Sequence, residues 1–315
     1  MEVRLVVTPG DPRGVGPDVA LDAFHRFSDS HPDVRVSFMG PDGPLGIDGL
    51  GALAEEHRRR DDDATSGAAA ARAIEHAVRQ ALDGEAHGVV TAPLHKPSLH
   101  AAGWLFPGQT EMLARLTGVE RVGMLMAAER TRLGPPLRVL LVTTHLALRD
   151  VADAVTVARL VDQVFLLHLA LHGDWGIADP RIGVCALNPH ASDGGLFGDE
   201  EEKIFAPALA ELEARGVSVS GPLPADTVFS RALAGDVDAV AAPYHDVGMA
   251  AFKTVSFGTG VNVTLGLPMI RTSPDHGTAF DIAGTGRADP SSMIEALSLA
   301  HRLAENRFDT SPDDV

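Results

Sequence analysis

The sequence predicts an α/β protein whose strands and helices alternate along the chain. Short apolar runs bounded by polar, Gly or Pro residues recur from end to end, as expected for buried strands. Longer segments with apolar residues at helical spacing separate these runs, which is typical of βαβ units. The chain has 315 residues, more than one simple hydrophobic core usually holds. We therefore expect one unit of two α/β subdomains spanning residues 1–315, with a soft and discontinuous boundary because no Pro/Gly/Ser-rich linker divides the chain.

Each element follows from its local pattern. The expected strands are residues 2–8, 34–40, 88–91, 122–126, 138–143, 181–187, 237–242 and 261–265. The expected helices are residues 17–27, 65–82, 110–116, 151–172, 200–215 and 291–305. Pro17 suits a first helical turn, and Gly84 ends the long Ala-rich helix. Residues 41–63 are Gly-rich and then strongly charged, so we interpret them as a loop with marginal structure, and we expect the acidic tail after Phe308 to be frayed.

Composition limits the classes of function. The formal net charge is −17, which argues against nucleic acid as a partner because phosphate backbones require basic surface. No run of about 18 apolar residues occurs and the N-terminus enters a strand pattern at once, so we expect no membrane span, no secretion signal and a cytoplasmic location. Cys185 is the only cysteine, which favours a buried thiol. Of the three lysines, Lys96 and Lys253 lie in motif-like segments, whereas we interpret Lys203 as part of a solvated helix face.

Three histidines each follow the end of an expected strand: His145, His190 and His245. In open α/β sheets the ligand site lies outside the carboxyl ends of the strands, so three imidazoles from distant parts of the sequence are expected to converge there. Three neutral imidazoles with one open coordination position suit a catalytic divalent metal ion. The competing interpretation is three unrelated loop histidines. Asp246 is a candidate either to orient the neighbouring imidazole or to accept a proton.

Two glycine-containing loops are candidate nucleotide contacts. Gly14 and Gly16 lie where the first strand passes into the first helix, and a helix N-terminus favours an anion. This segment lacks the third glycine of the dinucleotide-binding fingerprint, and a purely structural turn explains it equally well. A second loop, residues 275–286, is rich in small residues and contains His276 and Asp281. Its composition suits a loop that encloses a nucleotide.

Polar side chains suited to an anionic substrate occur in two further segments. Gln109 and Thr110 are candidate contacts, although a helix cap explains Thr110 equally well. Lys253, Asn262 and Arg271 offer an ammonium, an amide and a guanidinium that together would clamp a carboxylate or phosphate. The alternative is ordinary surface charge, which fits Asn262 least because two valines flank it in an apparent strand.

Taken together, these segments resemble the 4-hydroxythreonine-4-phosphate dehydrogenase family of vitamin B6 synthesis. The matching segments follow the family's order: TPGDPRGVGPD, VTAPLHK, PGQTE, TTHLALRDV, LNPHASDGG, GPLPADT, YHDVGMAAFK and GVNVTLGLPMIRTSPDHGTAFDIAG. This ordered set, which covers nearly the whole chain, is far more specific than a single glycine loop. GDPRGVGPD and HGTAFDIAG also resemble the isocitrate and isopropylmalate dehydrogenases. That wider likeness implies their two-domain fold, an active-site cleft between the domains, and a nicotinamide cofactor held without a Rossmann fold.

The resemblance also implies a site and a reaction. Carried over by position, the metal ligands are His145, His190 and His245, and the substrate contacts are Thr110, Lys253, Asn262 and Arg271. The implied reaction is metal-assisted hydride transfer from a small anionic alcohol, 4-phosphohydroxythreonine, to NAD or NADP, followed by decarboxylation of the 3-oxo product. Asp246, as general base, and Lys253 are the candidate catalytic residues. The family tolerates several divalent ions, so zinc, magnesium and cobalt stay open, and its shared site implies a homodimer.

One departure concerns Gln109, where the family usually has the histidine of Gly-His-Thr-Glu. An amide hydrogen-bonds but never carries the positive charge of imidazolium. The substrates of relatives, a cis-dihydrodiol of an aromatic acid or a phosphorylated sugar acid, therefore stay open. Rivals of another class are an acyl or phosphoryl transferase on a related scaffold and a degenerate ligand-binding paralogue. The retained histidines and polar clamp residues disfavour both.

Overall fold

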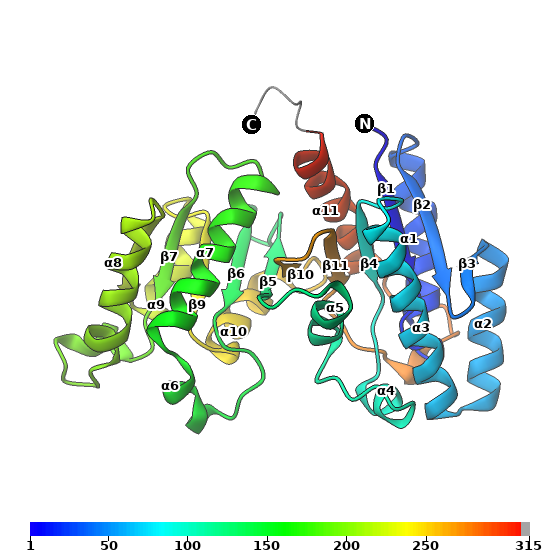
Figure 1. Cartoon of the computed structure of the whole chain (residues 1–315), viewed down its shortest axis with the longest axis horizontal. Helices are drawn as coiled ribbons and strands as arrows, with labels where there is room; N and C mark the ends of the chain where they lie inside the picture. Colours follow the sequence, from blue (N-terminus) through cyan, green and yellow to red (C-terminus); the bar gives the residue numbers. More distant parts are fainter. Residues whose placement is uncertain (310–315) are drawn as a thin grey trace. The chain divides into compact units, whose positions relative to one another are not determined.

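The computed structural model describes residues 1–309, which divide into two compact units (Figure 1). Unit 1 combines residues 1–120 with the segment that begins at Val261, and unit 2 is Arg121–Gly260. The chain thus leaves unit 1 once and returns to it, so the first unit is discontinuous in sequence. The acidic tail that we expected to fray lies, from residue 310 onward, outside the described residues.

Unit 1 contains a mixed sheet with the strand order β3-β2-β1-β4-β11-β10. Its strands are β1 (Arg4–Thr8), β2 (Arg35–Gly40), β3 (Gly43–Leu45), β4 (Gly88–Thr91), β10 (Val261–Leu265) and β11 (Ile270–Pro274). The central strands β2, β1, β4 and β11 run parallel, whereas β3 and β10 are antiparallel to their neighbours. The sequence did not predict β11, which carries Arg271 in its second position.

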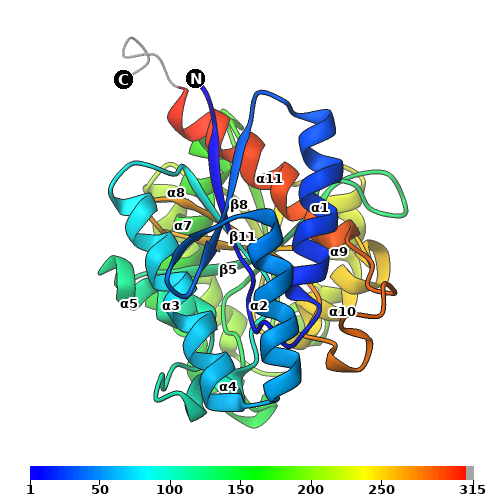
Figure 2. The same cartoon turned by 90° about the vertical axis from the view of Figure 1, so that its right-hand side faces the viewer.

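Helices cover this sheet on its two faces. They are α1 (Gly16–Ser30), α2 (Ile47–Arg60), α3 (Asp63–Leu82), α4 (Lys96–Ala101), α5 (Gln109–Thr117) and α11 (Ser291–Phe308), with a short 3₁₀ turn η4 (Phe280–Ile282). The helix α1 packs against α11, which itself contacts β4, β10 and β11, while α3 contacts β1, β2 and β4. Figure 2 looks onto α1, α2 and α3 of this unit.

The expectation of a loop over residues 41–63 is wrong, because this segment forms β3 and the helix α2. Leu50, Ala54 and His57 recur at helical spacing and are all buried, so they form one face that packs onto the unit. The arginines that suggested a loop occupy the last turn of α2, where positive charge is favourable at the C-terminal end of the helix dipole. Arg58 also forms an ion pair of 2.7 Å with Asp18 of α1.

Unit 2 contains a sheet with the strand order β5-β6-β9-β7-β8. The strands are β5 (Gly123–Ala128), β6 (Leu137–Leu141), β7 (Arg181–Cys185), β8 (Ser218–Leu223) and β9 (Ala239–Ala242). The longer helices are α7 (Val157–Gly173), α8 (Ala206–Ala214), α9 (Ala225–Leu233) and α10 (His245–Ser256), and the short turns are η1 (Leu148–Asp150), α6 (Val151–Ala154), η2 (Pro189–Asp193) and η3 (Glu201–Phe205). Only β5 runs antiparallel to its neighbour; β6, β9, β7 and β8 are mutually parallel.

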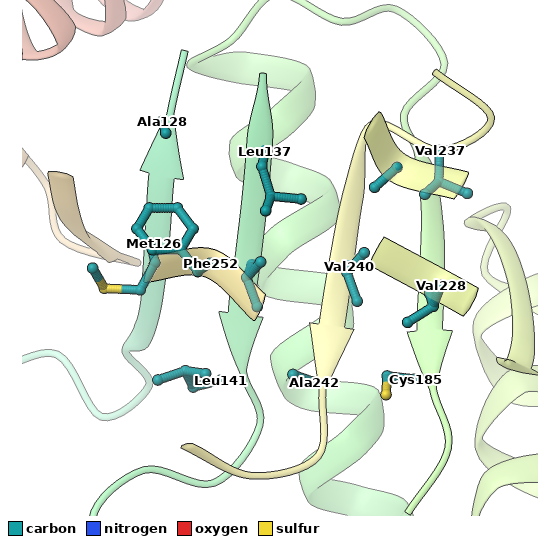
Figure 3. Packing of buried hydrophobic residues seen from close by; sticks show 12 residues of the cluster. Met126, Ala128, Leu137, Leu141, Cys185, Val228, Val237, Val240, Ala242 and Phe252 are labelled. Carbon is teal, nitrogen blue, oxygen red and sulfur yellow. The ribbon is translucent and has the colours of Figure 1, made fainter. Parts of the chain in front are cut away.

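The core of unit 2 lies between these strands and the helices α9 and α10. Figure 3 shows Met126, Leu141 and Val240 on three neighbouring strands, in one buried cluster with Phe252 of α10 and Val228 of α9. All five are essentially buried. This packing fixes the strand ends relative to the start of α10, which matters because the expected histidines lie there.

The single helix expected over residues 151–172 is broken in the structure. The helix α6 ends at Ala154 and α7 begins at Val157, with 88° between the two axes. Thr156 caps the new helix, since its hydroxyl accepts a hydrogen bond of 3.2 Å from the Arg159 amide. Within residues 1–309 no single helix is long and apolar enough to cross a membrane; only the bent pair of Leu148–Ala154 and Val157–Gly173 meets that requirement jointly.

Candidate functional site

The three expected histidine segments follow three adjacent parallel strands of unit 2. The register aligns Leu141 of β6 with Ala242 of β9, and Ala241 of β9 with Val184 of β7. Figure 3 accordingly shows Leu141, Ala242 and Cys185 in one row near the carboxyl ends of their strands. The loops that carry the histidines therefore leave the same edge of one sheet, as the strand-end pattern predicts.

His145 and His245 lie side by side at this edge. The amides of Val142 and Thr143 donate hydrogen bonds of 2.9 and 3.2 Å to the carbonyls of Ala242 and Pro243, which ties the two loops together. The imidazole centroids are 5.5 Å apart, with 43° between the ring planes. The Nδ1 atom of His245 is 2.7 Å from the carboxylate of Asp246. A small cavity of about 80 Å³ opens beside both rings.

His190 lies on a turn of unusual conformation. From His190 to Asp193 the four residues have φ angles of 53°, 53°, 66° and 45°, in the left-handed region that normally favours glycine. Each such residue costs about 1–2 kcal/mol, so the turn requires support from its surroundings. The side chain of His190 is exposed. Within residues 1–309 no three or more His, Cys, Asp or Glu side chains are gathered as a metal site. The structure therefore brings together two of the three expected ligands.

A buried carboxylate, that of Glu201, supports this turn. Its Oε1 accepts hydrogen bonds of 2.9 and 2.7 Å from the amides of Leu187 and Asn188. Its Oε2 accepts from the Asn188 side-chain amide at 2.9 Å and from the hydroxyl of Ser192. Burial tends to raise the pKa of Glu201, but the hydrogen bonds from Ser192 and Asn188 outweigh it and hold the pKa below its ordinary value. Lys203 pairs with Asp199 in the exposed position that the sequence predicts.

The donor set at this edge fits a divalent ion in its chemistry. It consists of three imidazoles from three adjacent strand ends, and one of them, His245, is already oriented by a carboxylate. Cys185 does not join this set, because burial raises the pKa of its thiol to about 12 and so disfavours the thiolate that metals bind. The assignment of His145, His190 and His245 as ligands stays a prediction.

The expected anion clamp is divided between the units. Lys253 lies on α10 of unit 2, eight residues after His245, which corresponds to roughly 12 Å along a helix. Its side chain is exposed. Asn262 and Arg271 lie on the paired strands β10 and β11 of unit 1. The structure thus shows Asn262 and Arg271 as neighbours in one sheet, and it places Lys253 in the other unit.

Arg271 is the centre of a buried hydrogen-bond network in unit 1. Only 3% of its surface is exposed. One terminal nitrogen donates to Thr264 at 2.9 Å, and the other donates to the hydroxyl of Thr91 at 2.7 Å and to Oε1 of Gln109 at 2.9 Å. The Gln109 amide nitrogen in turn donates to the carbonyl of Ala92 at 3.2 Å. Gln109 therefore contacts the guanidinium directly.

No carboxylate within the described residues forms an ion pair with Arg271. Burial lowers the pKa of this guanidinium to about 10, and the negative charge of Glu111 only partly opposes that effect. The Nε atom of Arg271 and the Oδ1 atom of Asn262 are buried and have no hydrogen-bond partner in residues 1–309. A buried cation with neutral partners is costly, and an anionic ligand would supply the missing compensation. The interpretation of Arg271 as ordinary surface charge is therefore wrong.

Thr110 lies close to this network, in the first turn of α5. The N-cap position of α5 belongs to Gly108, and no side chain caps the helix. The alternative interpretation of Thr110 as the helix cap is therefore wrong. Its half-buried side chain follows Gln109 directly, which is compatible with a substrate contact.

The two loops expected to hold the cofactor meet in unit 1. The amide of Val15 donates a hydrogen bond of 2.9 Å to the carbonyl of Thr278, and a Cβ atom on Gly14 would approach that carbonyl to 2.7 Å. A Cβ atom on Gly16 would lie 2.1 Å from the carbonyl of Pro9. Close backbone packing therefore accounts for both glycines, and their contact with a cofactor stays a prediction.

A larger cavity, of about 540 Å³, lies beside these loops in unit 1. Its lining includes Arg13, Arg58 and Phe280, and the Arg13 guanidinium lies 5.2 Å from the Phe280 ring centroid. In the same loop His276 has a buried Nε2 atom without a partner among the described residues, while Asp281 is exposed. The volume is in the range of small-molecule sites.

Several residues of these arrangements were not predicted from the sequence. Thr91 and Thr264 support Arg271 from strands whose apolar pattern gives no sign of that role. The sequence alone assigns no role to Glu201, although the helical spacing of Phe205, Ala208 and Leu212 extends back to it. Following that period would have indicated that Glu201 faces inward.

Comparison with known proteins identifies the family. The family described as pyridoxal phosphate biosynthetic protein PdxA matches residues 47–300. A 4-hydroxythreonine-4-phosphate dehydrogenase from Burkholderia vietnamiensis is 42% identical over 324 residues, covering 97% of this chain and 98% of that protein. The crystal structure of a 4-hydroxythreonine-4-phosphate dehydrogenase from Klebsiella pneumoniae superposes with a TM-score of 0.79 at 36% identity, covering 96% of this chain and 99% of that one.

A more distant likeness concerns the fold alone. An isocitrate dehydrogenase from Methylococcus capsulatus matches with a TM-score of 0.50 at 12% identity, covering 97% of this chain and 86% of that one. The predicted α/β fold of the isocitrate dehydrogenase type is thereby confirmed, as are the predicted resemblance and the prediction of a dehydrogenase that acts on an alcohol group. The chain belongs to the PdxA family of pyridoxal phosphate biosynthetic proteins.

Proposed function

We propose that this chain oxidises 4-phosphohydroxythreonine with NAD or NADP, using one divalent metal ion bound by His145, His190 and His245. The proposal rests chiefly on one observation: the guanidinium of Arg271 is buried, and all of its hydrogen-bond partners are neutral. Such a group stabilises an anionic ligand. The names of the curated relatives supply the substrate and the alcohol chemistry.

Each part of the site has a distinct task in this proposal. Arg271, with Asn262 and Thr110 beside it, binds the anionic end of the substrate, and Lys253 adds a second cation. A divalent ion held by His145, His190 and His245 would supply Lewis-acid chemistry, which would lower the pKa of the substrate hydroxyl and stabilise the developing alkoxide. Asp246 accepts a hydrogen bond from Nδ1–H of His245, which leaves Nε2 available as a metal ligand. This geometry favours Asp246 as the group that orients His245, rather than as the general base.

The cofactor and the second half-reaction complete the proposal. NAD or NADP binds at the junction of the Gly14 loop and the loop that carries His276 and Asp281, beside the cavity of about 540 Å³. A nicotinamide bound there would accept the hydride from the carbinol carbon, the hydroxyl proton would be released, and the resulting 3-oxo acid would lose carbon dioxide. We further propose that the enzyme is a homodimer with a shared site.

The direct test is a turnover assay with purified protein, 4-phosphohydroxythreonine and either NAD or NADP, with and without a chelator. We expect reduced nicotinamide to accumulate, the chelator to stop the reaction, and an added divalent ion to restore it. Arg271→Lys serves as the matched variant, because it keeps the charge but loses the planar donor set. We expect its KM to rise strongly. Full turnover in a chelated, metal-free preparation would refute the metal assignment.

One observation favours a second substrate class. Both polar ends of the Gln109 amide are occupied, by Arg271 and by Ala92, and the amide adds no positive charge. The part of the proposed anion site in unit 1 thus holds one positive charge, that of Arg271, which matches a singly charged carboxylate better than a doubly charged phosphate. A cis-dihydrodiol of an aromatic acid, or a sugar acid whose carboxylate occupies this position, is therefore the alternative substrate. Running both classes in the same assay decides between them by the ratio of kcat/KM.

A further inference from the structure

We propose that Glu201 is a positioning residue that holds the turn around His190 in place for metal binding. This inference rests on the proposed function, since it assumes that His190 is a ligand. Glu201 itself touches neither ligand nor ion in the proposal. It acts through the backbone on both sides of the histidine, and every contact involved lies within unit 2.

The contacts of Glu201 enclose the turn from both sides. Before His190, its carboxylate accepts hydrogen bonds from the Leu187 and Asn188 amides and from the Asn188 side chain. After His190, it accepts a hydrogen bond from the hydroxyl of Ser192. Only three residues, 189–191, therefore lie between the two anchored positions. The imidazole can reorient locally while the ends of its segment stay fixed.

The backbone of this turn explains why an anchor is needed. Four consecutive non-glycine residues, from His190 to Asp193, adopt positive φ angles. A run of this kind persists only where the surrounding structure determines it, and such strain is concentrated at functional sites. Glu201 is itself only 5% exposed, on the helical face that also buries Phe205 and Leu212. A charged group in such a position is tolerated because the turn satisfies both of its oxygens.

Glu200, a less buried neighbour, allows the anchoring role of Glu201 to be distinguished from an effect of local negative charge. Glu200 also accepts a hydrogen bond from the Asn188 side chain, at 2.7 Å, but no contact joins it to the far side of the turn in the described residues. Removing the Glu200 charge should therefore leave the Ser192 anchor intact. The exposed Glu211, which pairs with Arg215 on α8, is a control outside the turn altogether.

The decisive experiment measures metal affinity in metal-free protein by competition with a chelator, using Zn²⁺ and Co²⁺ as the probes. Glu201→Gln keeps the size of the side chain but places an amide donor where Oε2 accepts two hydrogen bonds. We expect its affinity for both ions to fall 10- to 100-fold, the range found when a group that orients a ligand is removed. The metal affinity of Glu200→Gln should fall less than that of Glu201→Gln, and the affinity of Glu211→Gln should equal that of the wild type.

A double mutant distinguishes positioning from general stability. In a His190→Ala background, Glu201→Gln should cause no further loss of metal affinity, because the ligand it positions is already absent. A purely structural role would instead lower affinity by a similar factor in both backgrounds, and that result would overturn the inference. If Glu201→Gln does not fold, Ser192→Ala decides the matter. It removes one hydroxyl, and we expect a several-fold loss of affinity, whereas wild-type affinity would refute the anchor.

The two proposals fail in different ways. If His190→Ala binds metal as tightly as the wild type, the three-histidine site is wrong and the anchoring role falls with it. If His190→Ala loses the ion but folded Glu201→Gln keeps wild-type affinity, the metal site stands and only the role of Glu201 is refuted.

Discussion

Replacing Gln109 by histidine tests how this chain matches charge at the substrate. In the wild type, Oε1 of Gln109 lies 2.9 Å from a terminal nitrogen of the buried Arg271. An imidazole at this position would stand next to a cation that has no carboxylate partner in the described residues. We therefore expect the imidazole of Gln109→His to be uncharged in the free protein. It should become protonated only when an anionic substrate binds both this imidazole and Arg271.

The expected size of the change in kcat/KM follows from this geometry. Two unit charges about 4 Å apart repel by about 4 kcal/mol at an effective dielectric constant of about 20, enough to lower the pKa of the new histidine by roughly three units. A bound phosphate offsets that repulsion. What remains is one charge-assisted hydrogen bond, about 1.5–3 kcal/mol, or a roughly 10- to 150-fold gain in kcat/KM for 4-phosphohydroxythreonine.

The assay is the pH dependence of kcat/KM for the wild type, Gln109→His and the neutral control Gln109→Asn. The gain should be largest at low pH, where imidazole is protonated, and should fade as the pH rises through its pKa, while the control shows no such trend. Efficient turnover of 4-phosphohydroxythreonine by the wild type, together with an unchanged or lower kcat/KM of Gln109→His at every pH, would refute the expected role of charge at position 109.

Further predictions address the remaining parts of the molecule. His190→Ala should lose both bound metal and turnover while its circular dichroism stays unchanged; retained turnover without metal would contradict the ligand assignment. Thr91→Val should destabilise the protein to urea by about 1.5–3 kcal/mol, because it leaves a donor of buried Arg271 without one partner; the exposed Thr254→Val is the control. Mixed dimers of His145→Ala and Lys253→Ala subunits should regain some activity if these residues meet across a shared site, and verified heterodimers without activity would place both residues in one subunit's site. Burial is the largest cause that lowers the pKa of His57, His87 and His168 below the ordinary 6.5. The unfolded chain therefore binds more protons just below that pH, and the free energy of unfolding should fall as the pH drops through this window, less steeply in His57→Gln.

The strands of the sheet were largely predictable because their apolar runs are bounded by sharp polar or glycine signals. The strand at Gly88–Thr91 has the predicted bounds, and the one at Val261–Leu265 does as well. Segments with weaker contrast were missed. The strand β8 contains Gly221 and Pro222 and is only partly buried, so no apolar run marks it. The helix α2 was hidden by its charges, which are favourable at a helix C-terminus but resemble a solvated loop in sequence.

The candidate site was predictable where a residue's place in the sequence, directly after a strand, determines its place in the fold. The three histidines follow strand ends, and a parallel sheet aligns such ends without further information. The network around Arg271 could not be inferred in the same way. Its partners, Thr91 and Gln109, are separated from it by 180 and 162 residues, and only the strand order brings β4 beside β11. The burial of the guanidinium was likewise invisible, because the sequence does not show that β11 is an inner strand.

The two proposed sites differ in how completely their side chains are brought together. In the proposed anion site of unit 1, Arg271 is held by two threonine hydroxyls and by the amide oxygen of Gln109. The proposed metal site in unit 2 has two imidazoles together and the third on a strained, anchored turn. A rigid anion site loses little entropy when it binds substrate, and this favours specificity. A turn that is anchored at its two ends would let the His190 imidazole adjust its direction to complete the coordination of an ion. The free energy of metal binding would then offset the strain of the turn, so a bound ion should stabilise residues 189–191 more than any other part of unit 2.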